Sequence, residues 1–194
     1  CYFLKNKETG ELLIVDPGDE AKRIKKFIED QELHPVAILL THGHFDHVMA
    51  VDSVRAAYHI PVYAAEAEKE TMHDASLNLS INMGGAMLSI EADHWLKDGE
   101  TITLLDQEVR CILTPGHTVG GMCFYFSKAG MLFSGDTLFQ ESVGRTDFPG
   151  GSMSEIVRSI REKLFVLPDA VQVYPGHGLM TCLLYTSPSP RDCS

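Results

Sequence analysis

Four apolar segments of this chain are each followed at once by histidine or aspartate. They are 36–40 before Thr41-His42-Gly43-His44-Phe45-Asp46-His47, 109–113 before Thr114-Pro115-Gly116-His117, 131–134 before Gly135-Asp136, and 171–174 before Pro175-Gly176-His177. Since the ends of neighbouring strands meet at one edge of a sheet, this placement gathers polar side chains from distant parts of the chain. The chain is therefore constrained to a fold in which four strand ends converge.

The cluster at residues 42–47 has the composition of a metal site. Imidazole and carboxylate groups crowded into six residues suit a divalent cation. His42 and His44 are two apart in an extended loop and can face the same ion. Asp46 and His47 enter a helix and approach from another side, which favours a second ion. An anionic Asp46 also complements the positive end of that helix.

The complete set of candidates exceeds the needs of one ion. A tetrahedral zinc ion takes about four ligands. The candidates are His42, His44, Asp46, His47, His117, Asp136 and His177. Two metal ions are therefore predicted, and a shared carboxylate is the simplest bridge between them. Asp136 is the candidate for that bridge, because it neither adjoins another ligand nor lies in the first cluster.

The remaining pattern predicts an α/β protein with more strands than helices. Short apolar runs typical of strands alternate with helical periodicity. Strands are expected at 12–15, 36–40, 61–64, 102–105, 109–113, 122–126, 131–134 and 171–174, and helices after Asp19, at 46–58, at 66–73 and after Ser152. In the last of these, Ser152 and Glu155 form a capping box, and Met153, Ile156 and Val157 are among the side chains expected on its buried face. Helices near the start, middle and end indicate sheets covered by helices on the outside.

Composition excludes several classes of protein. The chain has 194 residues, of which 44% are hydrophobic and 22% charged, as in an ordinary globular domain. A formal charge of -11 repels nucleic acid and anionic membranes, and no apolar run approaches the roughly 18 residues of a membrane span. Five cysteines at irregular spacing indicate neither a disulfide framework nor a thiolate metal site. We therefore expect a cytoplasmic protein that acts on a small molecule, with its oligomeric state left open.

The two ends differ from the rest of the chain. Residues 1–181 are expected to form one domain, and the first four residues read as part of a strand that begins earlier. Residues 182–194 lose the apolar periodicity and become rich in serine and proline, which predicts a disordered tail. Residues 182–191 also resemble the conceptual translation of a sequencing adapter, so the tail is alternatively artefactual.

The motifs resemble the signature of the metallo-β-lactamase fold superfamily. They are HxHxDH at 42–47, Gly-His-Thr at 116–118, Ser-Gly-Asp-Thr at 134–137 and Pro-Gly-His-Gly at 175–178, and they occur in the order of that superfamily. Within it, the compact length, the Asp136 step and the segment GRTDFPGG at 144–151 are similar to glyoxalase II and its short bacterial relatives. The resemblance implies a four-layer αββα sandwich and a hydrolase of hydroxyacyl-glutathione thioesters.

The resemblance also implies a role for each residue. It places His42, His44 and His117 on one metal and Asp46, His47 and His177 on the other, with Asp136 between them. Zinc is the expected metal, with iron or manganese as alternatives. Two ions that share a water lower its pKa toward about 7, so a bridging hydroxide is the expected nucleophile, and Asp46 would orient it. Arg145 is the candidate for binding a substrate carboxylate, and a simple pairing with Asp147 is the alternative.

Two other functions stay open. Persulfide dioxygenases of the same superfamily carry a similar GRTDF segment and hold one iron ion with two histidines and one aspartate. His42, His117 and Asp136 would then bind iron, and Asp46, His47 and His177 would be dispensable. The other alternative is a catalytically silent fragment.

Overall fold

The computed structural model describes residues 1–186, apart from the side chains at positions 83 and 84. Its first half contains β1 (Tyr2–Lys5), β2 (Glu11–Val15), α1 (Ala21–Asp30), β3 (His34–Leu39), α2 (Phe45–Val48), α3 (Val51–Tyr58), β4 (Val62–Ala65), η1 (Glu66–Glu68), α4 (Lys69–His73), η2 (Ser80–Gly84) and β5 (His94–Leu96). Its second half contains β6 (Thr101–Leu104), β7 (Gln107–Leu113), β8 (Met122–Phe126), β9 (Met131–Gly135), β10 (Leu138–Phe139), β11 (Ser142–Val143), α5 (Met153–Ser159), η3 (Ile160–Leu164), β12 (Gln172–Pro175), β13 (Thr181–Cys182) and α6 (Leu183–Thr186).

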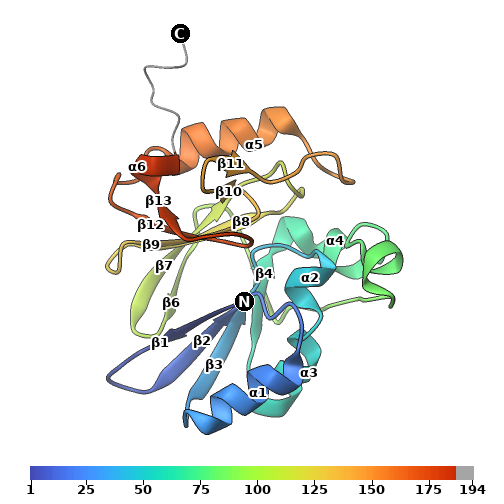
Figure 1. Cartoon of the computed structure of the whole chain (residues 1–194), viewed down its shortest axis with the longest axis vertical. Helices are drawn as coiled ribbons and strands as arrows, with labels where there is room; N and C mark the ends of the chain where they lie inside the picture. The colour runs from blue at the N-terminus through green and yellow to red at the C-terminus, as the bar shows by residue number, and fades with distance from the viewer. Residues whose placement is uncertain (187–194) are drawn as a thin grey trace.

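The elements form four layers, with two sheets between outer helices (Figure 1). The first sheet has the order β1-β2-β3-β4-β5, and β2 to β5 run parallel. The second sheet has the order β13-β12-β9-β8-β7-β6 and is antiparallel except for the β12–β9 pair. Helices α1 and α3 cover the first sheet, and α5 covers the second. The predicted αββα sandwich is confirmed.

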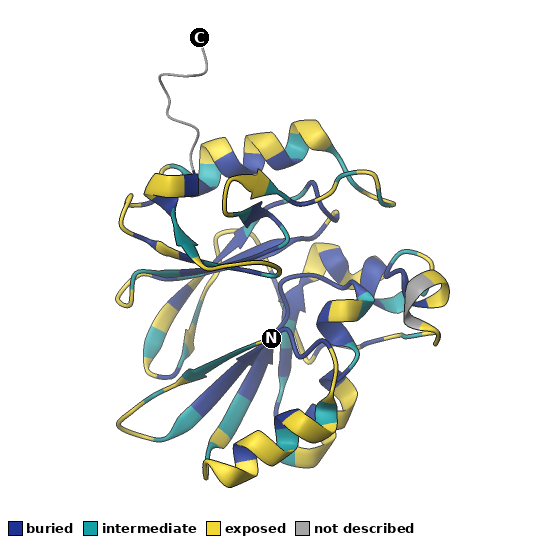
Figure 2. Ribbon diagram, viewed as in Figure 1, coloured by how far each residue is buried: buried dark blue, intermediate teal, exposed yellow. Residues whose placement is uncertain are grey.

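Strand β2 shows how the sequence builds these layers. Alternate side chains of a strand point to opposite faces, so a strand buried on both sides is apolar throughout. Leu12 and Ile14 pack among the side chains of α1 and α3, whereas Leu13 and Val15 pack in the core between the two sheets. All four side chains are fully buried, in line with the dark strands and lighter outer helices of Figure 2.

Helix α5 begins as the capping box predicts. The Ser152 hydroxyl accepts a hydrogen bond from the backbone N–H of Glu155, and Ile156 packs against the second sheet. Two side chains expected on the buried face are instead exposed, since Met153 is 55% and Val157 is 36% accessible. The helical face that meets the sheet is therefore narrower than the apolar pattern predicts.

Other boundaries also differ from the sequence-based expectation. The helix expected at 46–58 is divided into α2 and α3, and the Ala50 N–H between them donates to the Pro17 carbonyl. Residues 182–186, which were expected to belong to a disordered tail, instead lie in β13 and α6, where β13 pairs with β12 and Leu183 is buried in the core under α5. Residues 187–194 lie outside the described part of the chain. No helix among the described residues is long and apolar enough to cross a membrane.

Candidate metal centre

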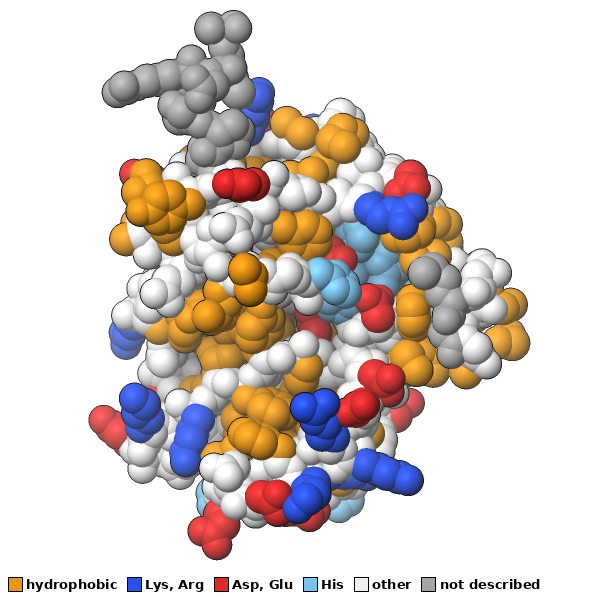
Figure 3. All heavy atoms as spheres, in the orientation of Figure 1, with side chains coloured by type: hydrophobic (Ala, Val, Ile, Leu, Met, Phe, Trp, Pro, Cys, Tyr) orange, Lys and Arg blue, Asp and Glu red, His pale blue; other side chains and the backbone are white. Residues whose placement is uncertain are grey.

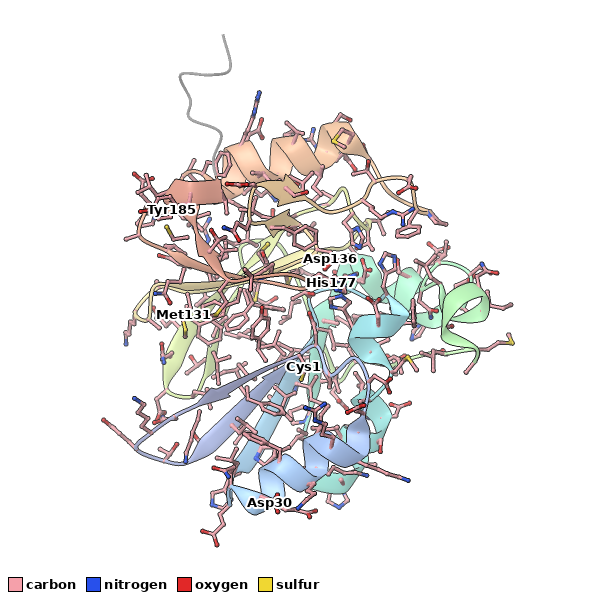
Figure 4. The ribbon with its side chains drawn as sticks, viewed as in Figure 1. Cys1, Asp30, Met131, Asp136, His177 and Tyr185 are labelled. Carbon is pink, nitrogen blue, oxygen red and sulfur yellow. The ribbon has the colours of Figure 1, made fainter. Side chains whose placement is uncertain are left out.

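The predicted residues meet at one edge of the sandwich. They follow the ends of β3, β7, β9 and β12, and Figure 3 shows histidine side chains gathered there with carboxylates on one face of the molecule. Asp136 and His177, which follow the ends of β9 and β12 in the same sheet, lie side by side in Figure 4, with 3.5 Å between the Asp136 Oδ2 and His177 Nε2 atoms. The convergence of strand ends expected from the sequence is present.

His42, His44 and His117 form a buried group of imidazoles. One potential ligand atom from each lies within 4.8 Å of the other two, and the His117 Nε2 and His44 Nδ1 atoms are 2.9 Å apart. All three residues are at most 5% exposed. Burial, followed by the repulsion of neighbouring imidazoles, lowers the pKa of His44 to about 3. Burial also lowers the pKa of His42 and of His117. These rings are therefore neutral at pH 7 and have lone pairs available for a cation.

A second group, more open to solvent, contains Asp46, His47 and His177. His177 Nε2 lies 3.1 Å from Asp46 Oδ2 and 3.4 Å from His47 Nε2. His47 is buried, whereas the side chains of His177 and Asp46 are 57% and 39% exposed. This side of the centre is where a small molecule can approach.

Asp136 lies between the two groups. One carboxylate oxygen is 3.5 Å from His117 Nε2, and the other is 3.5 Å from His47 Nε2. Gly176 packs so closely here that a Cβ atom on it would lie 2.1 Å from Asp136 Oδ1 and 2.7 Å from the His47 ring. The glycine of the Pro-Gly-His motif thus permits β12 to deliver His177 next to this carboxylate.

The donor atoms fit metal ions. His42 Nε2 and Asp136 Oδ1 are buried and have no hydrogen-bond partner among the residues that the structure describes, an arrangement that costs free energy unless a cation satisfies them. Although burial alone would lower it, the pKa of His47 is raised to about 9, because Asp16, Asp136 and Asp46 face its ring. A site with this much negative charge next to neutral imidazoles attracts divalent cations.

The family can now be assigned. Residues 1–177 match the sequence profile of the metallo-β-lactamase superfamily. The chain is also 41% identical over 185 residues to "Probable metallo-hydrolase YqgX" of Bacillus subtilis, an alignment that covers 95% of this chain and 87% of that protein. This chain belongs to the metallo-β-lactamase superfamily. It resembles curated proteins described as metal-dependent hydrolases.

Solved structures of superfamily members agree with this assignment. The crystal structure of BLEG-1, titled a B3 metallo-β-lactamase, is 39% identical with a TM-score of 0.89, and the match covers 94% of this chain and 88% of that one. TTHA1623 in a di-iron-bound form is 33% identical with a TM-score of 0.83, and the match covers 96% of this chain and 92% of that one. Because that structure holds iron, the identity of the metal that the present chain binds stays open.

Asp16 is a site residue that the sequence analysis missed. It is 5% exposed and directly follows β2, a strand end at which the sequence analysis names no candidate. Its carboxylate accepts hydrogen bonds from the Thr41 N–H (2.8 Å) and the Thr41 hydroxyl (2.6 Å), and lies 2.9 Å from His47 Nδ1. The rule that found the other residues, a polar side chain directly after an apolar strand, applies equally to Asp16. Its contact orients the Nε2 atom of His47 toward Asp136.

We expect Asp16→Asn to weaken metal binding about 10- to 100-fold, the scale for losing the partner that orients a histidine ligand. The asparagine Oδ1 can still accept a hydrogen bond from the Thr41 N–H, but the amide nitrogen that replaces Oδ2 cannot accept one from His47 Nδ1. Chelator competition measures the change, with Asp19→Asn as a control at an exposed position in the same loop. Equal metal affinity in Asp16→Asn and wild type would show that this contact does not orient His47.

The segment after β11 forms the rim of the centre. Arg145 pairs with Asp147 through two hydrogen bonds of 2.9 and 2.7 Å, and its guanidinium lies 4.3 Å from the centroid of the Phe148 ring. The Arg145 carbonyl lies 2.7 Å from His117 Nδ1, and the Phe148 ring is 5.6 Å from the His44 ring. The pairing of Arg145 with Asp147, which was the alternative to substrate binding, is therefore present. That Arg145 binds a substrate carboxylate stays a prediction.

Proposed function

We propose that this chain is a dinuclear metal-dependent hydrolase that cleaves thioesters of the hydroxyacyl-glutathione type. The observation that carries the proposal is the place of Asp136, whose carboxylate lies 3.5 Å from a histidine of each group. The ligand set is His42, His44 and His117 at the first position and Asp46, His47 and His177 at the second, with Asp136 shared. Zinc suits these nitrogen and oxygen donors, and iron or manganese are alternatives.

Divalent ions at these positions would activate water and polarise the substrate carbonyl. Asp46 reaches the open side of the centre, where its carboxylate would accept a hydrogen bond from the attacking water and hold the water in line with the carbonyl carbon. Water adds to that carbon, the carbon–sulfur bond breaks, and the thiol leaves with the proton that water gave up. Cys111 and Cys123 are fully buried in β7 and β8, so neither acts as a nucleophile in this scheme.

The rim supports a substrate with both polar and apolar parts. Phe148 stands beside His44 and His117, and Phe139 lies with its ring 6.4 Å from that of His177. These two rings would contact the substrate on either side of the scissile bond. Arg145 is exposed next to Phe148, and a substrate carboxylate would compete with Asp147 for its guanidinium.

A second candidate is β-lactam hydrolysis, which the likeness to BLEG-1 favours. A panel of acyl-glutathione thioesters assayed beside a chromogenic cephalosporin, with the same zinc-loaded protein, distinguishes the two. We expect kcat/KM for the best thioester to exceed that for the cephalosporin by at least about a hundredfold, because loss of a matched transition state costs several kcal/mol. The reverse order would assign the protein to lactam hydrolysis.

A further inference from the structure

Glu68 is a buried carboxylate that the reaction scheme does not use. It is 1% exposed and ends η1, directly after β4. Strand β4 is the parallel neighbour of β3, with Leu39 opposite Tyr63. Residues that follow β4 therefore lie beside the loop that follows β3, which carries His42 and His44.

The Glu68 carboxylate binds both loops that supply the first histidine group. Its Oε1 atom accepts the Gly43 N–H at 3.0 Å, between His42 and His44. Its Oε2 atom accepts the Thr118 hydroxyl at 3.0 Å and the Gly120 N–H at 2.7 Å, directly after His117. One side chain thus joins two segments of the chain that are far apart in sequence.

The two loops that donate to Glu68 approach the segment 68–72 so closely that each needs a glycine, Gly43 in one loop and Gly120 in the other. A Cβ atom on Gly43 would lie 2.7 Å from the Met72 side chain, and one on Gly120 would lie 2.3 Å from the Glu68 backbone nitrogen. Real Cβ atoms do not approach other atoms so closely. The close packing places both backbone N–H groups within reach of the same carboxylate.

Burial of the Glu68 carboxylate costs free energy of folding, which an apolar residue at this position would not cost. The three hydrogen bonds to Glu68 in the described structure come from neutral donors, and burial raises the pKa of this carboxyl group to about 7 against their effect. A buried charge without a cation destabilises a fold. An apolar side chain would avoid that cost, but it could not accept the two amide hydrogens.

We infer that Glu68 is a positioning residue, which holds the loops of His42, His44 and His117 at a fixed separation and thereby sets the affinity of the first metal position. This inference rests on the ligand set proposed above. Because Glu68 acts through the backbone of Gly43 and Gly120, it need not contact the metal or the substrate.

Glu68→Gln is the informative substitution. Glutamine has nearly the same shape, but one of its terminal atoms is an amide nitrogen that cannot accept a hydrogen bond. Whichever way the glutamine side chain is turned, its amide nitrogen replaces one carboxylate oxygen and faces the N–H of Gly43 or of Gly120, so one of these hydrogen bonds is lost. Glu70→Gln is the matched control, since Glu70 is exposed and lies two residues further along the same segment.

The experiment uses the full chain with His177→Ala, which removes one ligand from the second position, so that the first equivalent of metal is expected to bind at the first position. Cobalt binding is measured by chelator competition and by the absorption spectrum of the bound ion. We expect Glu68→Gln to raise the Kd about 10- to 100-fold and to change the spectrum, and Glu70→Gln to leave both unchanged. If Glu68→Gln does not fold, Thr118→Val removes one donor and should raise the Kd about two- to tenfold.

A Kd within twofold of the parent for Glu68→Gln, or for Thr118→Val where that variant replaces it, would overturn the inference. So would a lower melting temperature of the metal-free protein with an unchanged Kd, since that is the behaviour of a merely structural residue. The result is independent of the proposed substrate, because no activity is measured. Wild-type protein that binds fewer than two ions would instead overturn the proposed dinuclear function.

Discussion

Replacing Asp136 by alanine is expected to reduce thioester hydrolysis at least about a thousandfold and to lower the metal content of the protein at both positions. The carboxylate lies 3.5 Å from His117 of the first group and 3.5 Å from both His47 and His177 of the second, so its loss removes a ligand from each group. Lewis-acid stabilisation is worth several kcal/mol, and each 1.4 kcal/mol is a factor of about ten in rate. Steady-state kinetics and elemental analysis of the same preparation measure the two effects together.

Asp169→Asn is a suitable control for this variant, because Asp169 is an exposed aspartate in the turn before β12, away from the centre. It should retain full activity and full metal content. An Asp136→Ala protein that keeps two metal ions and its activity would show that this carboxylate does not join the two positions.

The second large effect is expected at the open side of the centre. Asp46→Ala and His47→Ala should each reduce thioester hydrolysis by at least about a hundredfold, the scale on which the loss of an oriented catalytic group is felt. Asp46 is the side chain proposed to orient water, and His47 belongs to the second ligand group, 3.8 Å from the Asp46 carboxylate. The rates of both variants with the best thioester of the panel test this prediction.

The same variants separate the hydrolase from a mononuclear iron dioxygenase. A facial iron site formed by His42, His117 and Asp136 would function without His47. We expect the iron-loaded wild-type protein to consume no oxygen with glutathione persulfide. Oxygen uptake that persists in His47→Ala would assign the protein to the dioxygenases.

The site was predictable because its residues obey a local rule. His117 and His177 each follow Pro-Gly at the end of an apolar strand, and Asp136 follows Gly135 at the end of another. A strand end fixes where the next side chain lies, whatever the order of the strands in the sheet. The sequence therefore places these residues at one edge, although it does not reveal which strands are neighbours.

Glu68 shows what this local rule leaves out. Its carboxylate reaches both histidine loops because β4 lies parallel to β3 and because the loop after β7 lies next to Glu68. Both conditions are properties of the assembled sheets and not of the local sequence. Exposure of Met153 and Val157 has a similar cause. Their helical spacing is correct, but the second sheet contacts only the face of α5 that carries Ile156. Helical periodicity predicts the face of the helix on which a side chain lies. Whether that side chain is buried depends on how much of that face the neighbouring sheet contacts.

The metal content of the purified wild-type protein tests the central claim most directly. Elemental analysis of protein never exposed to a chelator should give close to two divalent ions per chain, since Asp136 lies 3.5 Å from a histidine of each ligand group. One equivalent or fewer in such protein would contradict the dinuclear centre.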